Sequence, residues 1–596
     1  MNREFYDNER EIDLAEQKSL YKRAKKVVWA RTGVFTAMVF AFAFGYDGYF
    51  YAYVGLAVLV LIFSRLVSYH DYLKERQEFL KSRLAVLNSY IVRARGTWRK
   101  RSTDGTVYLK KDRPQDIDLH IFGEGSIFQY ICAARTKRGR DRLAESLSPV
   151  PPKFSQARLR QRGVAELLQR PRLSLDLEAL ARLMPNNHDT TELIENVEGE
   201  PPKLGKIFCL RFFLLPVFLI SCAAAYLGII NIYLPLVVPC FSLLVALIAL
   251  PKTSEVFTPL KIISKEMKLY YKIFERLEET DFHSTKMRHI HNALTDEVSA
   301  ARKIRMLLIF TDIIHARNNP FFFIIMNSLF LSDFFCATEL LRWRETAAKH
   351  LRKWIDAWSE AEVLLSLASI GQTRTTYCFP ELLDGDEPRI TAKNLTSLLI
   401  ADAKAVPNDA DLSAGTIIIT GANMSGKTTW IRTLASSVIL AYAGAPVCAE
   451  SFSVSSPAVF TSIRVNDDIS EGCSTFYAEL LRIKNMIEYS EKKLPMLICI
   501  DEIFKGTNAI DRIIGAKAAI LRLTNERSIT LVTTHDFELC DLAKENENIS
   551  NAHFEEYYVD DEIKFDFKLR EGRTTTTNAK YLLRMTGILN VPKESE

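Results

Sequence analysis

The chain has 596 residues, more than one hydrophobic core normally serves, so we expect several domains. Its net charge of +5 comes from 77 lysines and arginines against 72 aspartates and glutamates, a balance that leaves any nucleic-acid contact to local clusters. The ten cysteines include no CxxC pair, which excludes a metal centre of that spacing and favours reduced thiols in a cytosolic setting.

The first 68 residues are expected to form a charged tail followed by a membrane hairpin. Residues 1–30 carry charges of both signs, with too many acidic ones for a signal peptide, and we interpret them as a cytoplasmic tail. Two uncharged runs, 32–46 and 48–64, then define a predicted transmembrane hairpin over 31–68. Each run is shorter than the roughly 20 residues of a helical span, so a buried hairpin of a soluble protein remains the alternative.

A second hairpin is predicted at 205–252, after a stretch that is typical of a soluble helical domain. Residues 69–114 predict a long helix and a basic connector, and residues 115–204 predict the first part of a helical core. The run from Phe212 to Pro251 has no charged side chain and is about twice the minimum for one span. Two core helices of a soluble protein would show a polar face, and this run shows none.

Basic residues flank both predicted hairpins on the side of the chain termini. Lys25, Arg31 and Arg65 belong to the flanks of the first hairpin, and Lys252 and Lys261 follow the second. The positive-inside tendency therefore predicts a multi-pass protein of the inner or plasma membrane, with both termini and the C-terminal domain in the cytoplasm.

The remaining chain is expected to divide into a helical lever at 253–376 and an α/β domain at 377–596. Long amphipathic patterns run through the lever. Its apolar stretch at 320–335 contains Asn327 and Asp333 and is only 16 residues long, so we expect a buried helix there instead of another span. Beyond the lever, short β-type runs alternate with helical ones, which predicts a parallel sheet with crossover helices.

The segment TIIITGANMSGKTTW, at 416–430, contains the phosphate-binding pattern G-x-x-x-x-G-K-[ST] between a predicted strand and a predicted helix. Backbone N–H groups of such a loop surround phosphate oxygens, and the helix adds the positive end of its dipole. Lys427 is expected to reach the β- and γ-phosphates of ATP, and Thr428 to offer its hydroxyl to Mg²⁺. The predicted ATP-binding residues are Gly421, Ala422, Asn423, Met424, Ser425, Gly426, Lys427, Thr428 and Thr429.

Two further predicted strands end in residues that suit ATP hydrolysis. MLICIDE, at 496–502, ends in Asp501, which is placed to hold Mg²⁺ through water, and Glu502, which can orient or deprotonate the attacking water. SITLVTTH ends in His535, whose imidazole can sense the γ-phosphate. We therefore predict a Mg²⁺-dependent ATPase with Lys427, Glu502 and His535 as catalytic residues. The fold class is mixed: two transmembrane helical hairpins, an all-α core and lever, and a C-terminal α/β P-loop domain of the ABC-like kind.

Together these segments resemble the ATPase of the MutS mismatch-repair family. The glycine loop is followed by DDISEGCSTFYAEL (467–480), DEIFKGTNAID (501–511) and TTHDFEL (533–539), in the order found in that family. The Asn-Met pair inside the loop is uncommon among other P-loop proteins, which makes the resemblance specific. It covers roughly residues 115–190 and 255–590 and leaves out the predicted membrane segments.

The resemblance implies a homodimer with composite ATP sites. In the family the serine of the STFxxE motif reaches the nucleotide of the partner subunit, which implies that Ser474 binds ATP in trans. It also implies that Asn423 contacts phosphate or organises the subunit contact, and that the GTNAID turn at 506–511 shapes that contact. ATP would shift the pair toward a closed state only as far as it binds that state more tightly.

The sequence departs from the DNA-repair members of the family at three places. A predicted membrane hairpin occupies the position of the N-terminal mismatch-recognition domain. Ala405 stands where the family has an aromatic residue that stacks on adenine, and Thr396 and Ser397 replace its His-Pro pair. Residues 255–350, where a DNA clamp would lie, are helical but only moderately basic.

Three basic clusters, at 93–101, 135–142 and 158–162, leave two interpretations open. Such clusters can neutralise nucleic-acid phosphates, or they can face lipid headgroups and solvent. The first cluster, with Trp98 as its one interleaved aromatic residue, favours lipid or solvent. The other two suit a solvated helix face and a DNA contact equally.

Two functions follow from these predictions. In the first, a membrane-anchored MutS-like clamp binds duplex DNA with low specificity in a process related to mismatch repair. In the second, a membrane mechanochemical ATPase switch acts on a protein or lipid partner without mismatch recognition. Loss of DNA affinity on neutralising Arg138, Arg140, Arg158 and Arg160, from the second and third clusters, would favour the clamp. A transporter is disfavoured because the predicted spans contain no charged side chain.

Overall fold

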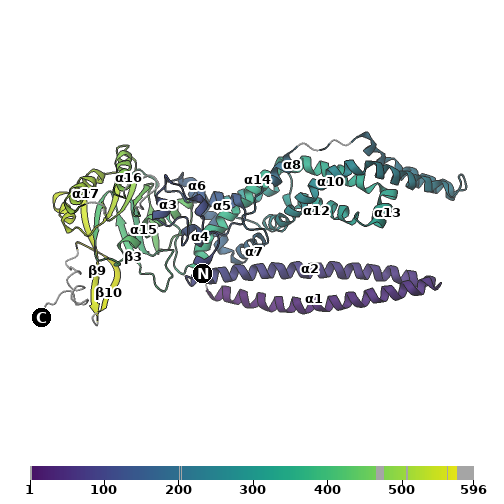
Figure 1. The fold of residues 1–596 in the computed structure, drawn as a ribbon, viewed down its shortest axis with the longest axis horizontal. Helices are drawn as coiled ribbons and strands as arrows, with labels where there is room; N and C mark the ends of the chain where they lie inside the picture. The colour runs from purple at the N-terminus through teal and green to yellow at the C-terminus, as the bar shows by residue number, and fades with distance from the viewer. Residues whose placement is uncertain are drawn as a thin grey trace.

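The computed structural model describes residues 3–199, 202, 205–464, 475–504, 508–559 and 562–573. The molecule is elongated, with an α/β domain at one end and a helical body in the middle (Figure 1). Two long helical pairs extend from the helical body, away from the α/β domain. The ends of these pairs that are farthest from the α/β domain are the segments predicted to enter a membrane.

The N-terminal pair consists of α1 (Arg3–Tyr46) and α2 (Phe50–Ala94), which pack antiparallel over their whole length. Gly48, with φ 98°, lies in the short turn that joins them. Apolar side chains near this turn point outward, and Phe40, Tyr51 and Leu61 are between 61% and 87% exposed. A tip with this apolar surface suits a hydrocarbon environment better than water.

A buried ion-pair network fixes the base of this pair to the helical body. Arg83 of α2 pairs with Glu9 at 2.5 Å and with Asp13, both on α1. It also pairs with Asp176 of α7 at 3.1 Å. Because breaking one buried pair leaves an uncompensated charge, the network holds α1, α2 and the helical body in one arrangement.

The helical body is built around α14 (Ser332–Thr373), a helix of 42 residues that leads into the α/β domain. Its buried side chains include Trp343, Trp354 and Trp358, and its last two turns are buried throughout. The helices packed around it include α4 (Ile127–Ile131), α5 (Lys137–Ser146), α6 (Phe154–Gln169), α7 (Pro171–Ala181), α8 (Thr191–Glu198), α11 (Thr285–Thr295) and α12 (Ala300–Ala316). The short helix α3 (Gln115–Asp118) packs against the α/β domain instead. Two 3₁₀ turns, η1 (Trp98–Lys100) and η2 (Thr106–Tyr108), lie in the connector before them.

The second helical pair consists of α9 (Leu214–Tyr226) and the long α10 (Val237–Glu278). The 3₁₀ helices η3 (Lys206–Phe212) and η4 (Leu234–Leu236) precede α9 and α10 respectively. None of the α9 side chains is buried, whereas the buried side chains of α10 begin at Ser242 and recur as far as Leu277. The uncharged segment of the sequence thus has no buried side chain in α9 and has buried positions only at intervals along α10.

The helix at 320–335 differs from the sequence prediction. We expected a buried helix, but in α13 (Pro320–Phe330) the buried residue is Asn327, while Phe321 and Ile325 are 78% and 55% exposed. Asn327 bonds to the side chain and backbone of Asp333, which in turn pairs with Arg317 at 3.2 Å. The polar side chains satisfy one another on the inner side, so the apolar side chains point outward.

The α/β domain contains two sheets. The larger has the strand order β10-β9-β4-β8-β7-β6, in which β10 is antiparallel to β9 and the other neighbours are parallel. The smaller has the order β1-β5-β2-β3. The strands are β1 (Glu381–Leu382), β2 (Ile390–Leu395), β3 (Asn408–Leu412), β4 (Gly415–Thr420), β5 (Ser451–Val454), β6 (Ala458–Ser462), β7 (Met496–Asp501), β8 (Ser528–Thr533), β9 (Ile549–Val559) and β10 (Glu562–Glu571).

The helices of this domain connect and cover the strands of the larger sheet. They are α15 (Lys427–Ala443), α16 (Thr475–Ser490), α17 (Ala509–Leu523), η5 (Phe537–Asp541) and α18 (Leu542–Glu545). The three strands that the motif segments predict are confirmed as β4, β7 and β8. They are neighbours in the sheet and parallel, so their carboxyl ends meet at one edge, where ligands of such sheets bind.

Candidate nucleotide-binding site

The glycine loop 421–426 joins the end of β4 to the start of α15. Gly421 and Gly426 have φ values of 143° and 110°, which side-chain-bearing residues rarely adopt. A Cβ atom on Gly421 would lie 2.7 Å from the backbone oxygen of Phe554 on β9. The loop therefore needs glycine at these positions both for its conformation and for its close approach to β9.

Lys427, at the start of α15, is 5% exposed and lies along the loop. Its Nζ donates hydrogen bonds of 2.8 Å to the carbonyl oxygens of Gly421 and Ala422. Glu556 of β9 is also buried nearby; burial raises its pKa, and the positive charge of Lys427 acts in the opposite direction. The ammonium group is thus placed beside the loop backbone that is expected to surround phosphate.

Thr428 and Asp501 face each other across the edge of the sheet. The Thr428 hydroxyl donates to the two carboxylate oxygens of Asp501, at 2.9 and 3.0 Å. The hydroxyl of Thr533, from β8, donates to Asp501 at 2.5 Å. The two residues predicted to serve Mg²⁺ are therefore brought together, and Thr533 orients the carboxylate.

Glu502 and His535 meet at the same edge, together with Asn423 of the loop. His535 Nε2 lies 2.8 Å from Asn423 Oδ1 and 3.2 Å from Glu502 Oε1. Because both partner atoms are oxygen acceptors, Nε2 carries the proton in this arrangement. The Glu502 backbone has φ 54°, and its N–H donates to the backbone oxygen of Thr533. This unusual backbone turns the carboxylate away from the strand and toward the loop.

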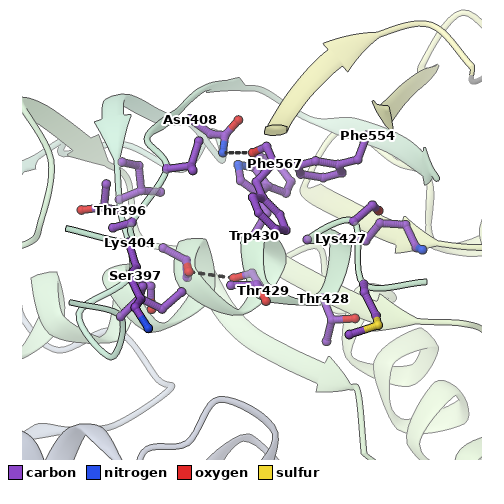
Figure 2. Close-up of a pocket in the computed structure, with 18 of the residues that line it drawn as sticks. Thr396, Ser397, Lys404, Asn408, Lys427, Thr428, Thr429, Trp430, Phe554 and Phe567 are labelled. Carbon is purple, nitrogen blue, oxygen red and sulfur yellow. Dashed lines mark hydrogen bonds between the residues drawn. The ribbon is translucent and has the colours of Figure 1, made fainter. Parts of the chain in front are cut away.

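A cavity of about 260 Å³ lies beside the loop, between β9, β10 and the segment 395–408 (Figure 2). The aromatic side chains of Phe554, Phe567 and Trp430 gather on one side of it, and Lys404 lies on the other. Ala405 also lines the cavity. The aromatic surface that the sequence lacks at position 405 is therefore supplied by other elements.

Phe567 was not identified from the sequence, because its position depends on a β-bulge. The pairing of β9 with β10 shifts register between Phe565 and Leu569, and Phe567 has φ 55°. Asn408 fixes the bulge: its Nδ2 donates to the Phe567 backbone oxygen at 2.9 Å, and its Oδ1 accepts from the N–H of Leu569 at 2.8 Å. A bulge commonly redirects a side chain in this way, and here it turns the ring toward the cavity.

Two buried polar atoms test whether these residues fit a nucleotide. Ser425 Oγ in the loop and Trp430 Nε1 in the cavity wall have no hydrogen-bond partner among the described residues. Buried polar groups are normally paired, so each calls for a ligand atom. Together with the glycine cradle and the buried Lys427, they fit a phosphate chain with an attached base. The hydroxyl and carboxylate of Thr428 and Asp501 are oxygen ligands of the type that Mg²⁺ prefers.

Part of the predicted composite site lies outside the described residues. Ser474 belongs to the segment 465–474, and the first residues of the GTNAID turn belong to 505–507. The glutamate of the STFxxE motif, Glu479, is described: it is 5% exposed and accepts a hydrogen bond of 2.7 Å from the N–H of Phe504. Glu479 thus fixes the chain that follows the Asp501–Glu502 pair.

The basic clusters divide between residues that face inward and residues that face solvent. In the first cluster Arg93 and Trp98 are each 1% exposed, whereas Arg95, Arg99 and Lys100 are exposed. In the second, Arg138 pairs with Asp356 at 2.8 Å and Arg140 is 7% exposed.

The third cluster is also bound to the rest of the protein. Arg158 pairs with Asp384 at 2.7 Å and donates to the backbone oxygen of Leu382. Arg160 donates to the backbone oxygen of Ala443 at 3.5 Å, and burial lowers its pKa. The four arginines proposed as DNA contacts therefore all have roles within the chain.

The α/β domain, with a glycine loop that opens α15 and three parallel strands that end beside it, is also recognisable by comparison with known proteins. Residues 417–595 match the family model of MutS domain V. The chain is 31% identical over 246 residues to the DNA mismatch repair protein MutS of Natronomonas pharaonis. That match covers 41% of this chain and 28% of the other protein, so the chain spans less than a third of that relative's length. The α/β domain is thus similar to domain V of the MutS family.

Proposed function

We propose that the protein is a membrane-anchored ATPase that hydrolyses Mg²⁺-ATP and transmits the resulting change to its helical body. One observation carries the proposal. Lys427, the Thr428–Asp501 pair and the Glu502–His535 pair converge where three neighbouring strands end. Such a set suits the binding of phosphate, the binding of a divalent cation and the activation of water.

Each residue has a role in this proposal. The loop N–H groups and Lys427 bind the phosphates, while Thr428 and Asp501 would hold Mg²⁺. Bound Mg²⁺ would supply positive charge that offsets the charge of the phosphates. Glu502 orients the attacking water and accepts its proton. His535, with its proton on Nε2, holds Glu502 and Asn423 together and so links the loop to the catalytic carboxylate.

Four helices support the proposed membrane anchor by length and composition. They are α1, α2, α10 and the helix that ends at Tyr226, with mean hydropathies of 1.7 to 2.4 in their most apolar windows. The exposed helix α13 packs beside α9 and α10, and we assign it to the same membrane-facing surface. Basic flanks put the termini and the ATP site in the cytoplasm. We further propose a homodimer, with Ser474 of each subunit reaching the nucleotide of the other.

Two kinds of molecule are candidates for the partner on which the ATPase acts, and a different observation favours each. Duplex DNA is favoured by the similarity to a protein named for DNA mismatch repair. A protein or lipid partner, without mismatch recognition, is favoured by the arginines of the second and third clusters, which have partners within the chain.

The test is the ATPase rate of the full chain purified in detergent, with and without duplex DNA at low salt. Glu502→Gln should lower the rate by a hundredfold or more while ATP still binds, because it removes the group that activates water. Glu526→Gln, at an exposed glutamate of the same domain, is the matched control and should leave the rate unchanged. Wild-type activity in Glu502→Gln would contradict the proposal.

Comparing the ATPase rate with and without duplex DNA identifies the partner on which the ATPase acts. A severalfold increase in rate on adding duplex DNA would identify DNA as that partner. An unchanged rate would assign the ATPase to a membrane or protein partner.

A further inference from the structure

A second polar cavity, of about 200 Å³, lies between the base of the N-terminal helical pair and the helical body. Five arginines and one carboxylate belong to its wall, and they come from α2, the connector, the loop after α4, α5 and the end of α7. They are Arg93, Arg101, Arg135, Arg140, Arg182 and Glu178.

The proposal that follows depends chiefly on Arg93, in the last turn of α2. Its side chain is 1% exposed, and its Nε and Nη1 have no hydrogen-bond partner among the described residues. Its guanidinium carbon lies 5.4 Å from the centre of the Tyr90 ring, a contact that uses the face of the group and leaves its N–H donors free. A buried charge without such partners is costly, so the fold retains these donors at a price in stability.

The nearby carboxylate does not neutralise the cluster. Glu178 accepts a hydrogen bond from the hydroxyl of Tyr90, and burial raises its pKa. In the part of the chain that the structure describes, none of the five arginines forms an ion pair with a carboxylate. The cavity therefore carries a large excess of positive charge.

Arg101 and Arg140 are held in place by backbone oxygens, and Arg135 and Arg140 also donate to the side-chain oxygen of Asn186. Arg101 donates to the carbonyls of Gln129 and Tyr130 at 2.9 and 2.8 Å, and Arg140 donates to that of Ala134 at 3.1 Å. Burial, with Arg93 next in effect, lowers the pKa of Arg101 to about 9, and burial with two neighbouring arginines lowers that of Arg135. Like charges are thus fixed close together, where a bound anion would relieve their repulsion.

We propose that this cavity binds a small soluble anion with two phosphate groups. Guanidinium groups bind phosphate oxygens in a bidentate manner, and several of them around one cavity match the charge of a diphosphate. Arg93 would supply its free donors to the anion. The bound anion would connect α2 with α5 and α7, and so stiffen the joint between the membrane pair and the helical body.

The position of the cavity excludes two larger sources of phosphate. The apolar part of α2 ends near Ser64, roughly 30 residues before Arg93, which corresponds to about 45 Å along the helix. Lipid headgroups at the membrane surface are therefore out of reach. The backbone of a DNA duplex cannot enter a cavity of this size to meet a side chain that is 1% exposed.

The test is equilibrium dialysis of radiolabelled pyrophosphate against the detergent-purified full chain at fixed ionic strength. All measurements use the Lys427→Ala variant, because the glycine loop is also expected to bind phosphates. This variant, the background for the comparison, should still bind about one pyrophosphate per chain. Arg93→Gln should weaken that binding tenfold or more, whereas Arg162→Gln, an exposed arginine of α6, should leave it unchanged. No saturable binding in the background, or equal binding with Arg93→Gln, would overturn the proposal.

Thermal unfolding separates this role from a purely structural one. If Arg93 is held for an anion, adding Arg93→Met to the Lys427→Ala protein should raise the melting temperature in anion-free buffer and abolish the increase that pyrophosphate causes. A lower melting temperature with an undiminished pyrophosphate effect would show that Arg93 serves the fold alone. This outcome does not depend on whether the glycine loop binds ATP.

Discussion

At the scale of single residues, Phe567 explains how a nucleotide site can lack the aromatic residue that usually precedes the Val-Pro-Asn segment. Ala405 leaves space in the cavity wall, and the bulge in β10 places the Phe567 ring in that cavity. Asn408, the asparagine of that segment, holds the bulge through two hydrogen bonds. The Val-Pro-Asn segment therefore contributes to the cavity indirectly, because it positions the Phe567 ring on β10.

Phe567→Ala should raise the KM for ATP about tenfold and leave kcat within a factor of two. Stacking of one base on an aromatic ring contributes about 1–3 kcal/mol, and the ring has no contact with the catalytic pair. Steady-state kinetics measure the effect, with Phe565→Ala as the control, because Phe565 is on the same strand but does not line the cavity. An equal rise in KM for both variants would contradict a stacking role for Phe567.

Glu362 of α14 should make the stability of the helical body depend on pH. Burial raises its pKa to about 7, although Thr136 and the N–H of Arg135 donate hydrogen bonds to it. The pKa of Glu362 is higher in the folded state than in the unfolded state. Its contribution to the free energy of unfolding is therefore fully present below about pH 4.5 and is lost as the pH rises through 7.

Denaturant unfolding at pH 5 and pH 8 tests this account of Glu362. The wild type should lose about 3 kcal/mol relative to Glu362→Gln between the two pH values, since the shift from 4.5 to about 7 corresponds to that free energy. Parallel curves for the two proteins would show that Glu362 titrates normally in the folded state.

At the scale of elements, the short helix α3 connects the helical body to the α/β domain. Asp118 is 0% exposed and accepts hydrogen bonds from the Thr461 hydroxyl and the N–H groups of Ile463 and Arg464. It also pairs with Arg482 of α16 at 3.2 Å. One carboxylate thus holds both sides of the segment that contains Ser474.

Asp118→Asn should lower the free energy of unfolding by about 2–4 kcal/mol, because an amide leaves buried donors and the Arg482 charge without an acceptor. Hydrogen exchange should rise in residues 458–464, and the ATPase rate should fall. Asp116→Asn is the matched control: Asp116 is a buried aspartate of the same helix, and its ion pair is with Arg113 of the connector. If both variants change exchange at 458–464 equally, α3 is only a structural support.

At the scale of the whole molecule, both helical pairs extend from the helical body in the direction away from the α/β domain (Figure 1). α14 runs between the two regions and is buried along its last two turns. On the proposed function, a change at the α/β domain would reach the helical pairs through this helix and through the Arg83 network at the base of α1 and α2.

Local patterns predicted the parts of the fold that depend on short stretches of chain. The glycine loop, β4, β7 and β8 follow from apolar runs that end in polar residues, and neighbouring parallel strands then bring Thr428, Asp501 and Glu502 together. Contacts between distant segments were not predictable in this way. The bulge at Phe567, the outward face of α13 and the burial of Arg93 and Trp98 each depend on partners elsewhere in the chain.

The measurement that tests the central claim most directly is photolabelling with azido-ATP of membrane vesicles that contain the full chain. The account predicts that inside-out vesicles are labelled, that right-side-out vesicles are not, and that the label stays in the pellet after extraction with alkaline carbonate. Lys427→Ala should abolish the label, and Lys404→Ala should weaken it less, since Lys404 belongs to the wall of the 260 Å³ cavity and not to the glycine loop. Label released by carbonate, or equal labelling of both vesicle orientations, would contradict a cytoplasmic ATP site on an integral membrane protein.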